Sequence, residues 1–423
     1  MSLIKRVNCR LCNSYSMDDV LNLNSIPLSE NYSETRYEAM SQIRYPLNIA
    51  QCRNCGHVQL TDIIDTKLLW NSYTYFTSNS HGMYDHFVEI ARETKEFIFE
   101  GSFTNQFAID IGSNDGTFLQ IAKNRGAKVL GVDPAIDVAK YANSQGIPTI
   151  ISVLNPETTN AIIAEYGQAD LVTAFNVFAH TDDLQNFVGL LHRLLKPGGL
   201  FVFEAQYLRD IIQKNLIATF FHEHMSHHSL LPLSSFLNSL GLQLFHALEY
   251  ESQQGSIVGF CIKSNNPIER SDKLNLLLAL EDSENLNSLE SMTSLRVRFE
   301  KNKIAVSQFL ETRKQSGYRI LGYGASRSGP TLIIQFELDN KIDYVVDDDT
   351  KKHGKFETGA GFEILPSETL LDYPKTVAII LAWVHAEKII EDNIAFIKAG
   401  GEFLVLSPDP RIISQNGVEL LVS

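Results

Sequence analysis

The chain has 423 residues, which is long for one hydrophobic core, so two or three domains are expected. Hydrophobic residues make up 44% and charged residues 20%, a balance typical of folded globular proteins and not of disordered ones. The formal net charge is −14, and no run of Lys or Arg interrupts it. Such a protein repels nucleic-acid phosphates, so a nucleic-acid partner is not expected.

The first residues, MSLIKRVNCRLC, have no apolar stretch behind their basic residues and do not resemble a secretory signal. No window approaches the roughly 18 continuous apolar residues of a membrane span. We therefore expect a cytoplasmic protein, monomeric and without a membrane partner. In a reducing compartment its five cysteines are not expected to form a disulfide framework.

Four of the cysteines form two Cys-x-x-Cys pairs, Cys9 with Cys12 and Cys52 with Cys55. Each pair lets two thiolates converge from one tight turn, and two such turns form a tetrahedral zinc site. The alternative is four unlinked buried thiols, which the repeated spacing disfavours. A site closed by four thiolates is structural, not catalytic. The sequence therefore predicts a zinc-ribbon-like domain over residues 1–75.

A run of alternating strand and helix signals follows the cysteines. Helical spacing of apolar residues predicts a helix over 80–100. The apolar runs that come next predict buried parallel strands separated by helices, which is a doubly wound Rossmann-like α/β domain over residues 76–248. The predicted strands are Phe107–Ile111, Lys128–Val132, Asp170–Phe175 and Gly199–Glu204.

The last part of the chain predicts a second Rossmann-like domain over residues 249–423. Leu242–Glu251 and Ser256–Lys263 are expected to be antiparallel strands at the junction. Apolar residues at helical spacing predict one long amphipathic helix over Glu281–Lys314. A second α/β unit is expected from Tyr318 onward. Its further strands are predicted at Ile342–Asp347, Thr376–Ala382 and Glu402–Leu406.

The segment Phe107–Gly116, FAIDIGSNDG, is a strand that ends in a glycine-rich turn. Gly112 and Gly116 would let the backbone approach a ligand closely. The pattern is not Gly-x-Gly-x-x-Gly, so it predicts no pyrophosphate cradle, and Asp110 at the strand end suits a cationic ligand part. The alternative is a glycine turn without a ligand.

A second acidic residue, Asp133, ends the next strand about 20 residues further on, where an acid can accept ribose hydroxyls. This order of motifs is the usual one of class I S-adenosylmethionine-dependent methyltransferases. Asn176 follows the strand that ends at Phe175 and is a candidate contact to the methionine part. The candidate cofactor-binding residues are Asp110, Gly112, Asn114, Gly116, Asp133 and Asn176.

The densest ionisable cluster lies in Phe220–His228, FFHEHMSHH. Neutral His is a natural base near pH 7, and a neighbouring Glu can orient it. A buried structural cluster and a metal site are the alternatives. The spacing is not His-Glu-x-x-His, and methyl transfer from a sulfonium needs no metal, so the base is favoured.

Over nearly its whole length the chain resembles the three-domain sugar C-methyltransferases that act on nucleotide-linked 4-keto deoxysugars. The resemblance is carried by the cysteine pairs and by motifs in all three predicted domains. These motifs are Tyr75–Ser80, Asp110–Gly116, Asn176–His180, His222–His224, Leu321–Ala325 and Asp343–Asp347.

The resemblance implies an active site and a substrate. It makes His224 the base and places His180 and Tyr75 (or its neighbour Tyr73) beside it, with His222 and Glu223 in the same segment. The implied substrate is a nucleotide-linked ketosugar, whose ketone acidifies the adjacent C–H. Removal of that proton gives an enolate, and its carbon attacks the sulfonium methyl group. Glu223 would orient a histidine or a sugar hydroxyl.

The chain departs from the family pattern at the sugar side. Phe221 replaces a common Tyr, Val258 replaces an Arg, and Ser328 stands where the family has Lys, with Arg327 one position earlier. These changes concern the acceptor and leave the methyl-donor motifs intact. O- or N-methylation of another glycan or metabolite, and a non-catalytic zinc and Rossmann binding protein, are the alternative functions.

Overall fold

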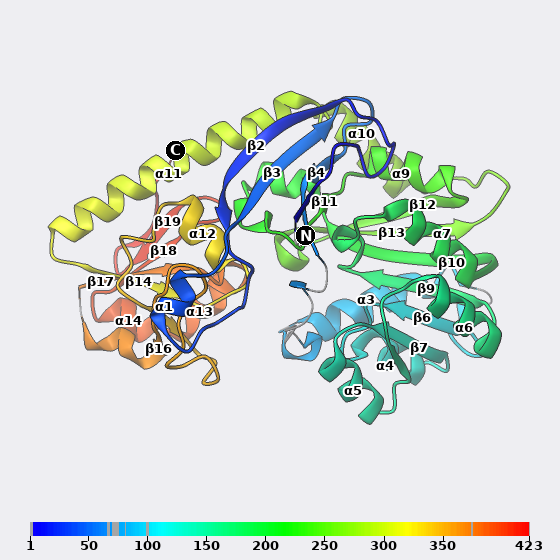
Figure 1. Cartoon of the computed structure of the whole chain (residues 1–423), viewed down its shortest axis with the longest axis horizontal. Coiled ribbons are helices and arrows are strands. Elements are labelled where there is room, and N and C mark those ends of the chain that lie inside the picture. Colours follow the sequence, from blue (N-terminus) through cyan, green and yellow to red (C-terminus); the bar gives the residue numbers. More distant parts are fainter. Residues whose placement is uncertain are drawn as a thin grey trace.

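The computed structural model describes residues 3–65, 68–69, 76–80, 82–98, 101–373 and 375–422. Two α/β domains lie side by side, and a ribbon of N-terminal strands runs over their junction (Figure 1). The helix α11 (Leu289–Gln315) runs along the C-terminal domain toward the other one (Figure 1). Among the described residues, no helix is long and apolar enough to cross a membrane.

The N-terminal domain is an antiparallel sheet that borrows a strand from the middle of the chain. Its strands run in the order β11-β4-β3-β2, and Ser226 and His227 of β11 pair with Gln59 and Val58 of β4. The N-terminal domain is therefore bonded directly to the histidine-rich segment. Its elements are β1 (Leu3–Lys5), β2 (Met17–Ile26), α1 (Arg36–Met40), β3 (Tyr45–Cys52), β4 (Val58–Leu60), β5 (Asp62–Ile64) and β11 (Ser226–His227).

The middle domain has a seven-stranded sheet in the order β12-β13-β10-β9-β6-β7-β8. Strands β10, β9, β6, β7 and β8 are parallel, and β13 and β12 join antiparallel. The strands are β6 (Phe107–Ile111), β7 (Lys128–Asp133), β8 (Thr149–Ile151), β9 (Ala169–Phe175), β10 (Leu195–Gln206), β12 (Leu242–Tyr250) and β13 (Ser256–Lys263).

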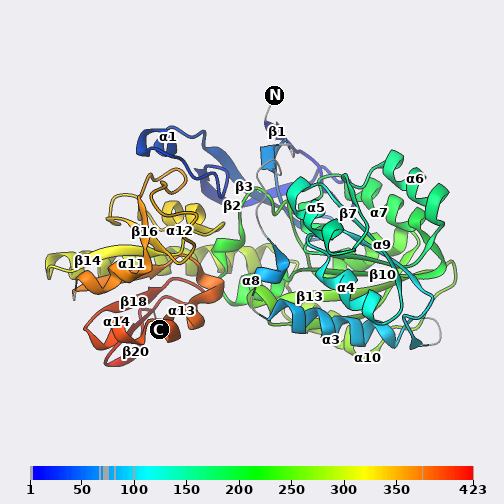
Figure 2. The same cartoon turned by 90° about the horizontal axis from the view of Figure 1, so that it is seen from below.

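Helices cover both faces of this sheet (Figures 1 and 2). All five residues of β6 are buried, which explains why its sequence is a continuous apolar run broken only by Asp110. The helices are α3 (Met83–Lys95), α4 (Thr117–Asn124), α5 (Ile136–Ser144), α6 (Pro156–Tyr166), α7 (Leu184–Leu194), α8 (Leu208–Gln213) and α9 (Leu230–Ser239).

Two features at the domain junction differ from the sequence prediction. Strand β13 pairs with β10 over Ser256–Ile262 and with β12 up to Lys263, so the middle sheet extends past residue 248 to residue 263. The single helix predicted over Glu281–Lys314 is instead two helices, α10 (Asp272–Ser283) and α11. Asn285 adopts a left-handed φ of 49°, which ends α10, and Ser288 precedes the first residue of α11.

The C-terminal domain repeats the Rossmann-like plan in a second seven-stranded sheet, ordered β16-β15-β14-β17-β18-β19-β20. Its first five strands are parallel and its last two antiparallel. The elements are β14 (Arg319–Tyr323), α12 (Gly329–Gln335), β15 (Val345–Asp347), β16 (Ile364–Pro366), β17 (Thr376–Ile380), α13 (Ala386–Asp392), α14 (Ile394–Lys398), β18 (Glu402–Val405), β19 (Arg411–Ser414) and β20 (Gly417–Leu420).

Candidate active site and zinc site

The two cysteine pairs meet in one cluster in the N-terminal domain. The four Sγ atoms all lie within 4.8 Å of one another, with Cys9 and Cys55 3.6 Å apart and Cys12 and Cys52 3.5 Å apart. Tetrahedral coordination with Zn–S bonds of about 2.3 Å would separate the sulfurs by about 3.8 Å. The donor set and its spacing therefore fit a structural zinc ion.

A cavity of about 440 Å³ opens beyond the carboxyl ends of β6, β7 and β9. The glycine loop after β6 forms part of its wall. Gly112 has a φ of 70°, and a Cβ there would lie 2.3 Å from Cγ2 of Val177. Gly116, with a φ of 80°, precedes α4 and would place a Cβ 2.9 Å from Cγ2 of Ile147. Both positions need glycine for backbone conformation and for space.

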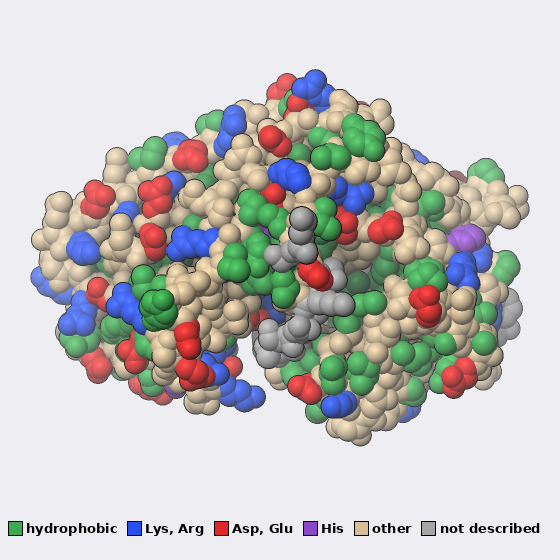
Figure 3. Space-filling model, viewed as in Figure 1, with side chains coloured by type: hydrophobic (Ala, Val, Ile, Leu, Met, Phe, Trp, Pro, Cys, Tyr) green, Lys and Arg blue, Asp and Glu red, His purple; other side chains and the backbone are tan. Residues whose placement is uncertain are grey.

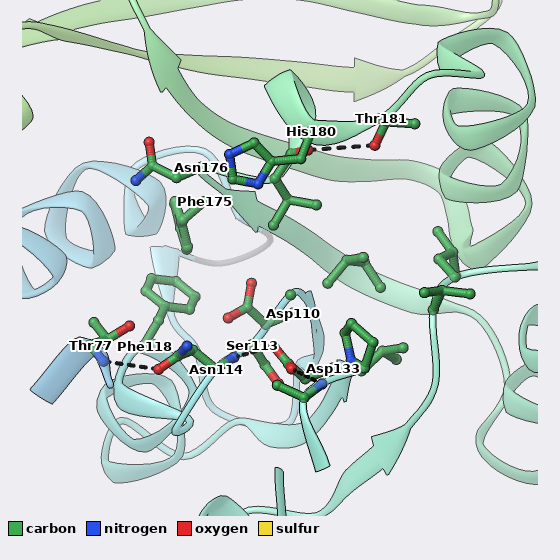
Figure 4. A pocket seen from close by; sticks show the side chains of 18 of the residues that line it. Thr77, Asp110, Ser113, Asn114, Phe118, Asp133, Phe175, Asn176, His180 and Thr181 are labelled. Carbon is green, nitrogen blue, oxygen red and sulfur yellow. Dashed lines mark hydrogen bonds between the residues drawn. The ribbon is translucent and has the colours of Figure 1, made fainter. Parts of the chain in front are cut away.

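Asp133 lies at the end of β7 and faces the cavity (Figure 4). One carboxylate oxygen accepts the N–H of Asn114 at 2.8 Å, and the other accepts the N–H of Ala135 at 2.8 Å. Burial raises the pKa of this carboxyl. Each oxygen keeps a free lone pair, so Asp133 can still accept hydroxyl hydrogen bonds from a ribose.

Asp110 is a buried carboxyl that also faces the cavity (Figure 4). The hydroxyl of Thr173 donates to it at 2.6 Å, and the two residues are direct cross-strand neighbours on β6 and β9. Burial raises the pKa of Asp110 to about 7, with a further increase from the charge of Asp133 and a decrease from the Thr173 hydrogen bond. A cationic ligand would stabilise the ionised form of Asp110.

The glycine loop is also connected to the segment before α3. The N–H of Thr77 donates to Oδ1 of Asn114 at 2.9 Å, and the N–H of Ser78 donates to Oδ2 of Asp115 at 2.8 Å. Asn114 and Asn176 both have left-handed φ values, 50° and 56°, and both line the cavity. The six candidate cofactor-binding residues thus lie in the wall of this cavity, except Gly116, which begins the adjoining helix.

The structure brings His180 and His224 together. Their rings are stacked with centroids 5.2 Å apart at an angle of 15°, and His180 lines the cavity. Nδ1 of His224 lies 2.7 Å from the carbonyl oxygen of Thr219. Because a carbonyl only accepts, Nδ1 carries the proton, and Nε2 of the neutral ring is left with a free lone pair. Burial lowers the pKa of His224 to about 4 and that of His180 well below its usual value.

Glu223 takes part in an ion-pair triad that joins all three domains. Arg327 donates to Glu223 at 3.0 Å and to Glu30 at 2.5 Å. Burial raises the pKa of Glu223, and the positive charge of Arg327 opposes that rise. Arg327 also lowers the pKa of His180 and His224. The positive charge of Arg327 therefore helps to hold both imidazoles neutral.

His222, another predicted catalytic residue, is not among the residues that line this cavity. Nε2 of His222 lies 3.2 Å from the carbonyl oxygen of Pro46, and its ring packs edge-on against Tyr45. Tyr75 and Tyr73 lie outside the described residues. Within the described ranges, the four cysteines form a group with metal-ligand spacing, whereas the histidine-rich segment does not.

Thr173 and Arg10 are site residues that the sequence prediction missed. Thr173 bonds to Asp110 only because of the strand register, which a single sequence does not give. Arg10 is buried and bonds to Asp182, a residue of the cavity wall. Because Arg10 lies between two predicted zinc ligands, nothing in the sequence indicated its contact with the middle domain.

Three protein-family models match the chain in succession. Residues 9–70 match a zinc binding domain, residues 84–247 a methyltransferase domain, and residues 251–408 the C-methyltransferase C-terminal domain. The C-methyltransferase NovU of Streptomyces niveus is 29% identical over 407 residues, which are 96% of each chain. A ubiquinone biosynthesis O-methyltransferase of Methylobacterium sp. (strain 4-46) is 36% identical over 97 residues, 22% of this chain and 38% of that protein.

Two solved structures share a likeness with part of the chain. The PH0226 protein of Pyrococcus horikoshii OT3 covers 47% of this chain and 99% of its own, with 15% identity and a TM-score of 0.37. Magnesium protoporphyrin IX methyltransferase of Synechocystis PCC 6803, solved with bound S-adenosylmethionine, covers 43% and 81%, with 13% identity and a TM-score of 0.32.

The motif order, the cavity and the matched methyltransferase domain define the chain as an S-adenosylmethionine-dependent methyltransferase with a class I Rossmann-like fold. Its cofactors are S-adenosylmethionine and, in the N-terminal domain, a structural zinc ion. More particularly, its C-terminal part matches the C-methyltransferase C-terminal domain, and it is similar to the C-methyltransferase NovU along nearly the whole chain. These findings confirm the predicted fold class, enzyme class and cofactors.

Proposed function

We propose that this enzyme methylates carbon, at the position next to the ketone of a nucleotide-linked 4-keto deoxysugar, with His224 as the base. One observation carries the proposal. The Thr219 carbonyl fixes the proton of His224 on Nδ1, so that Nε2 is a free acceptor, and the ring stacks on His180 in the wall of the donor cavity. A neutral imidazole beside the methyl donor is suited to proton removal from carbon.

In this proposal, S-adenosylmethionine is bound by the residues of the middle domain that line the cavity. Asp110 faces the cationic part of S-adenosylmethionine, and Asp133 accepts its ribose hydroxyls. Gly112 and Gly116 shape the loop, and Asn114 and Asn176 present polar groups to the same space. S-adenosylmethionine supplies the electrophilic methyl group when it is bound.

The C-terminal domain supports an acceptor role rather than a second donor site. Its strand-end acid Asp347 accepts the N–H groups of Ala325 and Asp349, at 2.7 and 2.8 Å, as Asp133 does in the first domain. Here, however, Lys352 also binds Asp347, and both Lys352 and the Tyr32 hydroxyl donate to the Ala325 carbonyl. The chain itself fills this position. The molecular surface is hollowed between the two α/β domains, where an extended acceptor could lie (Figure 3).

The chemistry then has two parts. Nε2 of His224 removes the proton from the carbon next to the ketone, which the ketone acidifies, and the electron pair is delocalised onto the ketone oxygen. That carbon attacks the methyl group, a carbon–carbon bond forms, and the carbon–sulfur bond of the sulfonium breaks. His180 supports the base through its stacked ring, and Glu223 with Arg327 keeps the surrounding charge balanced. Tyr75 is proposed at the acceptor side by the resemblance alone, and His222 has no part in the proposed mechanism.

Deuterium exchange tests the proposed base. In D2O, the wild-type enzyme should exchange the hydrogen next to the ketone of a nucleotide-linked 4-ketosugar, and His224→Gln should lose this exchange. His192→Gln is the control, because His192 lies on α7 and does not line the cavity. Exchange at the wild-type rate in His224→Gln would refute the base. Methyl transfer by an enzyme that causes no exchange would favour O- or N-methylation.

A further inference from the structure

Arg10 is a fully buried arginine inside the first zinc knuckle, between Cys9 and Leu11. Its guanidinium does not point to the zinc ligands but into the middle domain. Nη1 donates to the carbonyl oxygens of Leu60 at 2.7 Å and Met225 at 2.8 Å. Nε donates to the carboxylate of Asp182 at 3.0 Å. One side chain therefore bridges the zinc knuckle and two separate segments of the middle domain.

These two segments are the ones that carry the stacked histidines. Met225 follows His224 directly, and its N–H donates to the carbonyl oxygen of Ala179 at 2.9 Å, immediately before His180. Asp182 lies two residues after His180 and is part of the donor-cavity wall. The guanidinium of Arg10 thus contacts both histidine segments, through Asp182 and the Met225 carbonyl.

The knuckle itself is fixed in a way that determines where Arg10 points. The backbone N–H of Arg10 donates to Oε1 of Gln59 at 2.8 Å, and Gln59 lies on β4, the strand that pairs with β11. The N–H of Asn13 donates to the carbonyl of Cys9 at 3.0 Å and closes the turn. A second arginine, Arg6, also binds Asp182, at 2.9 Å.

The second knuckle offers an internal comparison. Arg53 occupies the same place in Cys52–Cys55 that Arg10 occupies in the first pair. Arg53 is exposed and pairs with Asp18 within the N-terminal domain. Of two arginines with the same sequence position in a zinc knuckle, one is turned to solvent and one to the active site.

We propose that Arg10 is a positioning residue that couples zinc binding to the shape of the donor cavity and to the alignment of His180 with His224. The part concerning His224 rests on the proposed function, whereas the coupling between the zinc site and the donor site does not. If zinc fixes the knuckle, and the knuckle fixes Asp182 and Met225 through Arg10, then the two cofactors must bind cooperatively. Such coupling is reciprocal, so each cofactor tightens the other by the same factor.

The coupling is measured on the full-length enzyme without an acceptor. The dissociation constant of zinc is determined by chelator competition with and without saturating S-adenosylmethionine, and that of S-adenosylmethionine by calorimetry with and without zinc. We expect both constants to improve by the same factor, at least about fivefold. Arg53→Gln should keep this factor, and Arg10→Gln should reduce it to about one.

A second readout separates positioning from a merely structural role. Ring nitrogen resonances of 15N-labelled histidine, assigned by single His substitutions, should shift for His180 and His224 in Arg10→Gln, while zinc content stays full. Asp182→Asn, which keeps the two carbonyl contacts of Arg10, should shift His180 more than His224.

The wild-type measurement decides the proposal even if Arg10→Gln does not fold. A zinc affinity that saturating S-adenosylmethionine leaves unchanged overturns the coupling, as does a fivefold effect that persists in Arg10→Gln. Loss of carbon methylation with the coupling intact would refute the proposed function and leave the role of Arg10 standing.

Discussion

Asp110→Asn should weaken the binding of S-adenosylmethionine and remove much of its pH dependence. Asp110 is buried in the cavity wall, and burial raises its pKa to about 7. A cation in the cavity requires the ionised carboxylate, so binding must release the proton that Asp110 carries below pH 7. Affinity for the donor should therefore rise with pH through 7, by up to about tenfold per unit on the acid side.

The size of the loss follows from the kind of contact. A hydrogen bond to a charged group contributes about 1.5–3 kcal/mol, which is roughly a 10- to 150-fold change in the dissociation constant. Asn has nearly the shape of Asp and can still accept from the Thr173 hydroxyl, which lies 2.6 Å from Asp110. The substitution therefore removes the charge and changes little else in the cavity wall.

The assay is calorimetry with S-adenosylmethionine at several pH values between 5.5 and 8.5, together with S-adenosylhomocysteine, which has the amino group but lacks the sulfonium. At low pH the wild-type affinity should approach that of Asp110→Asn, because a protonated Asp resembles Asn. Parallel pH profiles for the two proteins, or an unchanged affinity in the variant, would refute the assignment of Asp110 to the cationic part of the donor.

Three further predictions concern the cavity and the histidines around it. Gly112→Ala should weaken the binding of S-adenosylmethionine at least about tenfold, because the new Cβ would lie 2.3 Å from Cγ2 of Val177 and the residue has a φ of 70°. Adding Val177→Ala should restore only part of the lost affinity, because the φ remains unfavourable. A wild-type dissociation constant for Gly112→Ala in calorimetry would contradict this prediction. At saturating donor, kcat should fall with acid only near pH 4, where His224 becomes protonated; an acid limb near 6.5 would count against His224. The ring of His228 stacks 5.1 Å from that of Phe178, and burial lowers its pKa to about 4. In the unfolded chain this histidine takes up its proton at a pKa of about 6.5, so the free energy of unfolding should fall as pH drops from 6.5 to 4, by about 1.4 kcal/mol per pH unit for this group. In urea titrations at several pH values, His228→Phe should show a smaller dependence of the free energy of unfolding on pH. The same dependence as in the wild-type protein would contradict the prediction.

Local signals in the sequence were enough for the elements that position the donor site. The five residues of β6 form an uninterrupted buried strand, and the turn after it needs glycine at Gly112 for reasons of backbone conformation. Asp133 was predictable because the next strand of such a unit ends about 20 residues later. The zinc site could also be predicted, because the Cys-x-x-Cys spacing of its ligands is a local feature of the sequence.

Contacts between distant segments could not be predicted in the same way. Only Glu223 separates His222 from His224, but the N–H of His224 donates to the carbonyl of Phe221 in a turn, so the two rings have different surroundings. Glu223 is predicted to orient a histidine or a sugar hydroxyl, and its pairing with Arg327, 104 residues away, could not be read from the sequence. The break before α11 depends on the left-handed conformation of Asn285. The sequence did not indicate this break, because a helical pattern with many charged residues continues on both sides of it.

The most direct test of the proposed function is the position of the transferred methyl group. The enzyme is incubated with S-adenosylmethionine labelled with 13C in the methyl group and with a panel of nucleotide-linked 4-ketosugars, and the product is analysed by NMR. We predict that the label appears as a carbon-bound methyl group next to the ketone, and that His224→Gln gives no such product while it still binds the donor. A label on oxygen or nitrogen, or full carbon methylation by His224→Gln, would contradict the proposed mechanism.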